Sequence, residues 1–172
     1  MLSEEMIAAL NAQIETEGFA SAQYLAMGSW AESKGFNGTA QFLYRQADEE
    51  RMHMLKLFHY INEAGGFAIS PPVVAPRTEF ESFQELFEMI LKQEQGVSAK
   101  INSLVSLAFE QKDHTSHNFL QWYVSEQLEE EALFRSILDK LRIIGDNGGA
   151  LYMFDKDLQA EGANQAGSIS TE

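Results

Sequence analysis

Cysteine is absent from this chain of 172 residues. Its absence excludes a disulfide framework, cysteine-ligated zinc, iron–sulfur clusters and cysteine nucleophiles, and it is consistent with a reducing compartment. No stretch approaches the roughly 18 apolar residues that a membrane-spanning helix needs. The first residues, Met1 to Glu5, lack the basic start and apolar run of a signal peptide. We therefore expect a cytoplasmic protein without a membrane partner.

Basic residues are also scarce, with 12 lysines and arginines against 26 acidic residues and a formal net charge of −14. Such a field opposes binding to nucleic acid phosphates and attracts cations. Solubility alone would also account for an acidic surface. Hydrophobic residues make up 45% of the chain, enough for a real core, and the length predicts a single domain over residues 1–172.

Proline occurs only three times, always between residues 71 and 76, so the rest of the chain is free to form long helices. Apolar residues recur at helical spacing in four long segments. These predict helices over about 4–34, 38–64, 83–111 and 116–144. A short apolar segment predicts a fifth helix over 152–160.

The proline-bearing segment from Phe67 to Glu81 is extended in character. About 15 residues at roughly 3.3 Å each span about 50 Å, whereas the first predicted helix is about 45 Å long. The segment can therefore cross the full length of a bundle and make the second and third helices parallel. The expected fold is all-α: a four-helix bundle with one long crossover, the arrangement of ferritin-like bundles, plus a short fifth helix.

The first candidate metal-binding motif is Glu50-x-x-His53. Residues three apart share one helix face, so this carboxylate and this imidazole can hold one metal ion. The motif alone is weak, because glutamate and histidine are common on solvated helix faces. Carboxylate di-iron bundles add one glutamate from each of two helices and a second Glu-x-x-His. Glu17 and Glu94 lie mid-helix as required, but the last helix carries Gln127-x-x-Glu130 instead.

Many carboxylates with a single histidine make an oxygen-rich site suited to Fe(II), Fe(III) and Mn(II). The alternative is that Glu17 and Glu94 are solvated and that their register agrees by accident. A glycine, Gly18, follows Glu17 in the middle of the first predicted helix. It costs about 1 kcal/mol relative to alanine, and the sequence shows no compensation.

Over nearly its whole length the chain resembles the bacterial non-haem ferritins. The residues that carry the resemblance are Glu17, Tyr24-Leu25, Glu49-Glu50-x-x-His53, Glu94, the segment from Asn118 to Glu130, Asp139-Lys140-Leu141 and Leu151-Tyr152-x-x-Asp155-Lys156. The resemblance implies a ferroxidase centre in which Glu17, Glu50 and His53 hold one iron. Glu50, as a bridge, would hold the second iron together with Glu94 and Glu130, and Gln127 would contact bound oxygen or water.

The same resemblance implies a third iron site formed by Glu49, Glu126, Glu129 and Glu130. For Glu129 the alternative is an ordinary acidic surface. Tyr24 corresponds to the family tyrosine that gives an electron beside the centre, and its alternative is a buried tyrosine with a satisfied hydroxyl. Haem is not expected, because Arg51 occupies the position of the haem-ligating methionine of bacterioferritins.

By this resemblance, Fe(II) is oxidised by O2 or H2O2 and mineralised inside a hollow shell of twenty-four copies, with the short fifth helix at a four-fold axis. One alternative is a di-iron oxidoreductase acting on an organic substrate, which usually has the second ligating histidine that is missing here. Another is a non-catalytic helical assembly module, in which Glu17 and Glu94 would be exposed.

Overall fold

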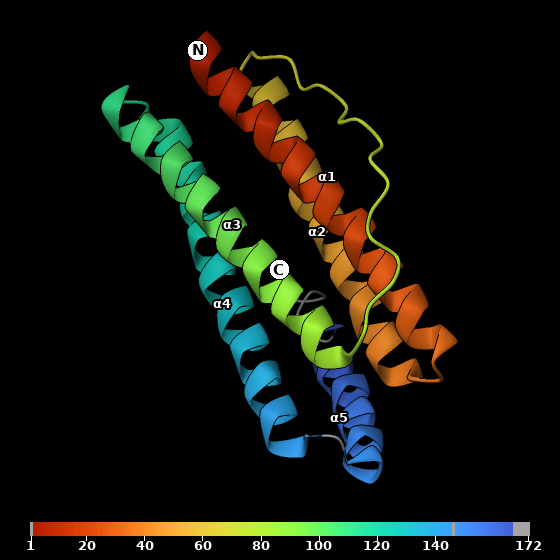
Figure 1. Cartoon of the computed structure of the whole chain (residues 1–172). Helices are drawn as coiled ribbons and strands as arrows, with labels where there is room; N and C mark the ends of the chain where they lie inside the picture. Colours follow the sequence, from red (N-terminus) through yellow and green to blue (C-terminus); the bar gives the residue numbers. More distant parts are fainter. Residues whose placement is uncertain (1, 146, 167–172) are drawn as a thin grey trace.

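The computed structural model describes residues 2–145 and 147–166, with the backbone alone over residues 161–166 (Figure 1). Its helices are α1 (Glu4–Ser33), α2 (Asn37–Glu63), α3 (Phe83–Glu110), α4 (His114–Ile144) and α5 (Gly148–Ala166). Helix α1 packs along α2, α3 packs along α4, and α5 lies at one end of the bundle against α2. The predicted all-α bundle with a long crossover between α2 and α3 is confirmed.

Side-chain caps fix three of the helix starts. Ser3 accepts a hydrogen bond from the Met6 amide, and Ser82 accepts one from the Glu85 amide. Asp113 accepts from the Ser116 amide, so α4 begins at His114, two residues before the predicted start. Each cap satisfies an amide that has no partner within its own helix.

The fifth helix begins at Gly148, four residues before the predicted start, and continues to Ala166 rather than ending at residue 160. The Asn147 side chain accepts a hydrogen bond from the Ala150 amide at 3.1 Å. This cap compensates for the poor helix propensity of Gly148 and Gly149. Both glycines lie before the predicted span of 152–160.

A buried carboxylate joins α5 to the start of α2. Asp155 accepts hydrogen bonds from the Gly38 amide at 3.1 Å, the Thr39 amide at 2.7 Å and the Thr39 hydroxyl at 2.9 Å. A Cβ atom at Gly38 would lie 2.0 Å from the Asp155 carbonyl oxygen, so only glycine permits this approach. Helix α5 therefore caps α2 from 116 residues further along the chain.

The extended segment between α2 and α3 runs along the outside of α1 (Figure 1). Two α1 side chains hold its backbone. Asn11 donates to the Phe67 carbonyl and accepts from the Ile69 amide, and Gln23 donates to the Arg77 carbonyl and accepts from the Arg77 amide. The crossover is therefore fastened to α1 by side-chain bonds rather than by strand pairing.

Gly18 lies on α1 beside the crossover. A Cβ atom there would lie 3.1 Å from Pro71 Cγ and 3.3 Å from Met54 Sδ. The absent side chain leaves room for Pro71. This close approach is the compensation that the sequence did not show.

The core consists of two apolar clusters stacked along the bundle. The cluster near α5 includes Tyr24, Phe42, Phe87 and Phe134, and the other includes Leu10, Leu57, Ile101 and Leu120. On each of the four long helices the two clusters are separated by a short polar stretch. Over residues 2–145 and 147–166, no helix combines the length and apolar character needed to cross a membrane.

Candidate metal centre

The polar stretches between the two apolar clusters meet at one depth in the bundle. They supply the buried side chains Glu17 from α1, Glu50 and His53 from α2, Glu94 from α3, and Gln127 and Glu130 from α4. None of the six is more than 6% exposed. The alternative of solvated glutamates at positions 17 and 94 is therefore wrong.

Three of these residues form an inner cluster, Glu17, Glu50 and His53. Their ligand atoms all lie within 4.8 Å of one another, and His53 Nδ1 is 3.5 Å from Glu50 Oε2. Two carboxylates and an imidazole at this separation can converge on a single cation. The spacing of three residues on α2 places Glu50 beside His53, and the antiparallel packing of α1 brings Glu17 to them.

Unpartnered oxygens mark the same place. Glu17 Oε2, Glu50 Oε2 and Glu130 Oε2 are buried and have no hydrogen-bond partner in the part of the chain that the structure describes. Within the described part of the chain, no lysine or arginine is buried beside these carboxylates. Buried carboxylates need compensation, which a metal ion would supply. The donor set therefore fits a hard cation.

Burial raises the pKa of Glu17 well above its ordinary value, and the charge of Glu50 raises it further. Burial likewise raises the pKa of Glu50, with the charge of Glu94 as the next cause. For Glu130, burial and then the charge of Glu49 raise the pKa. Without a cation these carboxyls tend to hold protons, and a bound metal ion would favour their ionised forms.

Glu94 lies outside the inner cluster, and both of its oxygens are hydrogen-bonded. Tyr24 donates to Glu94 Oε1 at 2.7 Å. Gln127 donates from Nε2 to Glu94 Oε2 at 3.1 Å and to the Glu94 carbonyl at 3.2 Å. Each oxygen keeps a free lone pair for a cation. Burial, followed by the charge of Glu94, raises the pKa of Tyr24 well above its usual range, so the phenol stays protonated and remains a donor.

An outer cluster contains Glu49, His53 and Glu126, with ligand atoms again within 4.8 Å of one another. Both of its carboxylates are half-buried, and burial raises the pKa of each. His53 belongs to both clusters, so the two potential cation positions are neighbours. The structure brings Glu49 and Glu126 together as predicted, whereas Glu129 is exposed and lies outside this cluster.

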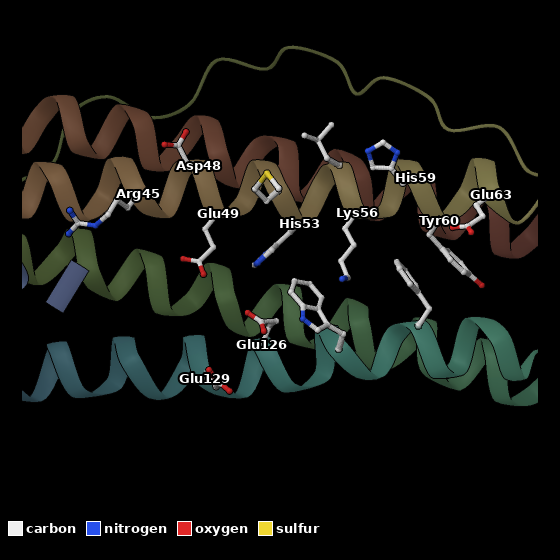
Figure 2. A pocket seen from close by; sticks show the side chains of 14 residues that line it. Arg45, Asp48, Glu49, His53, Lys56, His59, Tyr60, Glu63, Glu126 and Glu129 are labelled. Atoms are coloured by element: carbon white, nitrogen blue, oxygen red, sulfur yellow. The ribbon is translucent and has the colours of Figure 1, made fainter. Parts of the chain in front are cut away.

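The outer cluster lines a cleft of about 940 Å³ between α2 and α4 (Figure 2). His53 meets Trp122 edge to face, with 5.2 Å between ring centroids. The Lys56 ammonium lies 4.1 Å from the centre of the Trp122 ring. The cleft therefore gives access to His53 from between α2 and α4, whereas Glu17 reaches the same residue from α1.

Two buried glutamines that contact the clusters were not predicted from the sequence. Gln13 donates from Nε2 to Glu17 Oε1, and Gln46 donates from Nε2 to Glu49 Oε2, both at 2.8 Å. The available signal was their spacing, four residues before Glu17 and three residues before Glu49 on the same helix face.

Comparison with known proteins agrees with the fold. The profile of the family described as Ferritin-like domain matches residues 7–144. A probable bacterial non-heme ferritin-like protein of Haemophilus influenzae is 48% identical over 92% of this chain and 96% of its own length. A bacterial non-heme ferritin of Escherichia coli O6:H1 is 45% identical over the same shares.

Among solved structures, an open pore ferritin from the archaeon Archaeoglobus fulgidus superimposes with a TM-score of 0.91 at 40% identity, covering 92% of this chain and 98% of that one. The fold, the buried carboxylates and the long matches agree, and the chain belongs to the ferritin family as one of the bacterial non-haem ferritins.

Proposed function

We propose that this ferritin stores iron by oxidising Fe(II) at the buried carboxylate site and keeping the Fe(III) as a mineral inside a shell of many copies. Family membership supports the storage role. The observation that carries the site is the set of three buried, unpartnered carboxylate oxygens on Glu17, Glu50 and Glu130. In a helical module with a purely structural role, these unpartnered oxygens would only lower the stability of the fold.

In this proposal Glu17, Glu50 and His53 hold one Fe(II). The second lies between Glu50, Glu94 and Glu130, with Glu50 as the bridge. The nearness of Glu50 to both groups supports this division, because the charges of Glu94 and Glu130 both raise its pKa. A third iron would lie at the outer cluster, held by Glu49 and Glu126 together with Glu130 and the exposed Glu129.

Iron is the substrate of this reaction. Two ferrous ions held side by side each give one electron, which together reduce O2 to H2O2 or H2O2 to water. Oxygen ligands bind the harder Fe(III) more strongly than Fe(II), which lowers the free energy of oxidation. Tyr24, hydrogen-bonded to Glu94 at 2.7 Å, lies where it would supply a further electron to the centre. Gln127 holds the other Glu94 oxygen and would contact bound water or oxygen.

An aerobic Fe(II) titration far beyond two ions per subunit tests this function. Iron retained by the sized particle is then counted. We expect retention far above the capacity of the paired sites, by a particle of about twenty-four copies, and loss of fast oxidation in Glu50→Ala and His53→Ala. Glu131→Ala is the control acid, because Glu131 instead bonds Ser98 and Arg135. Saturation at the paired sites in a small particle would contradict storage.

The cleft between α2 and α4 supports a second candidate, a di-iron oxidoreductase acting on an organic substrate. About 940 Å³ is room for a small organic molecule, and Met52, Phe119 and Trp122 line it. Saturation of the titration at the paired sites is the outcome that this alternative requires.

A further inference from the structure

Three buried glutamines outside the predicted ligand set make different kinds of contact. Gln13, Gln23 and Gln46 are each at most 3% exposed. Both amide atoms of Gln23 bond the Arg77 backbone, which fastens the crossover. Gln13 and Gln46 instead each donate to a carboxylate of a metal cluster. The first contact is structural, and the other two need another explanation.

Gln13 leaves Glu17 with one oxygen bonded and one free. Its Nε2 donates to Glu17 Oε1 at 2.8 Å, and Glu17 Oε2 is buried without a partner. A carboxylate that is held through one oxygen cannot turn freely, and Glu17 contributes one oxygen to the inner cluster with Glu50 and His53. The bond therefore determines which Glu17 oxygen is available to a cation.

The other end of the Gln13 amide argues against a purely structural role. Gln13 Oε1 is buried and has no hydrogen-bond partner among the described residues. An unsatisfied buried acceptor destabilises the fold, and an apolar side chain of similar size would avoid that cost. Gln13 donates an N–H hydrogen bond to Glu17, which methionine could not do.

Gln46 makes the matching contact in the outer cluster. Its Nε2 donates to Glu49 Oε2 at 2.8 Å, and Glu49 shares that cluster with His53 and Glu126. Each cluster therefore has one carboxylate held by a neighbouring amide from the same helix. His53 belongs to both clusters. The orientations of Glu17 and Glu49 therefore affect the distance between His53 and a cation at each site.

We propose that Gln13 and Gln46 are positioning residues, Gln13 for the inner metal site and Gln46 for the outer one. The proposal rests on the proposed function, since it assumes that both clusters bind cations. Hydrogen bonds to ligating carboxylates fix their orientation, and loss of such a bond typically lowers metal affinity by roughly 10–100-fold. The two glutamines act on different carboxylates, so their effects should be separable.

Anaerobic titration with Co(II), followed by its visible absorption, tests the proposal on the full-length protein. Bands lost in Glu17→Ala define the inner site, and bands lost in Glu126→Ala define the outer one. We expect Gln13→Met to weaken the inner site by roughly 10–100-fold and to shift its bands while sparing the outer site. Gln46→Met should do the reverse. Wild-type Co(II) affinity and spectra in both variants would overturn the proposal.

Thermal unfolding of the metal-free protein separates positioning from folding. Gln23→Met is the matched control: it removes two satisfied bonds, and we expect a lower midpoint with unchanged Co(II) binding. Gln13→Met removes the unsatisfied Gln13 Oε1 but leaves Glu17 Oε1 without its donor, so we expect a midpoint close to that of the wild type. A midpoint lowered as far as in Gln23→Met would make Gln13 structural and overturn its assignment. If the wild type shows no Co(II) bands that Glu17→Ala removes, the inner site does not bind the metal and the proposed function itself fails. That result differs from wild-type binding in the glutamine variants, which would overturn only the positioning roles.

Discussion

Replacing Glu50 with glutamine should stabilise the metal-free protein while greatly weakening its response to metal. Glu50 is 2% exposed, its Oε2 has no hydrogen-bond partner among the described residues, and the charges of Glu94 and Glu130 lie nearby. Glutamine keeps the size, removes the charge and offers N–H donors to the neighbouring Glu17. A buried unsatisfied group costs about 1–3 kcal/mol. In a chain of this length about 1 kcal/mol moves the unfolding midpoint by roughly 2–4 °C, so we expect a gain of roughly 2–12 °C near neutral pH.

The gain should depend on pH in a defined direction. Burial raises the pKa of Glu50 in the folded protein, so the stability gained from its protonated form is complete below the unfolded pKa of about 4.3. That stability is lost as the pH rises through the folded pKa. The midpoint of Glu50→Gln should therefore match the wild type most closely at pH 5 and exceed it most at pH 8.

Differential scanning calorimetry of chelator-treated protein, with and without Zn(II), measures both effects. Zn(II) at about 100 times its Kd should stabilise the wild type by about 2.7 kcal/mol, and Glu50→Gln should respond far less. A metal-free midpoint below the wild type at pH 8, or an equal Zn(II) response in both proteins, would refute the reasoning that the carboxylates form an unsatisfied cation site.

Substitutions at three further positions test other contacts. Gly18→Leu should displace the crossover at Pro71, which limited proteolysis would detect as faster cleavage before α3. The free energy of unfolding of Gly18→Ala should stay within about 1 kcal/mol of that of the wild type in denaturant. Asp155→Ala removes the cap on α2 and should cost about 0.5–2 kcal/mol in the same assay. Tyr24→Phe should keep the Co(II) stoichiometry but shift the absorption of the site that contains Glu94, because one donor to that carboxylate is lost; unchanged spectra would show that the hydrogen bond does not affect the ligand.

Sequence patterns were sufficient for the four long helices and the positions of the buried acids. Helical period alone puts Glu50 and His53 on one face, and the length of the crossover requires parallel second and third helices. The start of the fifth helix was not predictable from propensity, because Asn147 compensates for Gly148 and Gly149 through a cap.

The hydrogen bonds of the site could not be predicted in the same way. That Tyr24 meets Glu94 depends on the relative height of α1 and α3, which residue spacing within one helix does not determine. Gln13 and Gln46 resemble ordinary polar helix residues until burial is known. The role of Gly18 likewise depends on a segment more than fifty residues away, since Pro71 contacts it only after the crossover has taken its path.

The carboxylate of Asp155 also sets an order of events during synthesis. The N-terminal part of a chain is made first, yet the Thr39 amide at the start of α2 donates to a carboxylate 116 residues downstream. At the start of the helix that carries Glu49, Glu50 and His53, the amides therefore gain these hydrogen bonds only after residue 155 has left the ribosome. A nascent chain that stalls before residue 155 would present the bundle with that end of α2 still open, even though all six buried metal-site residues had already been made.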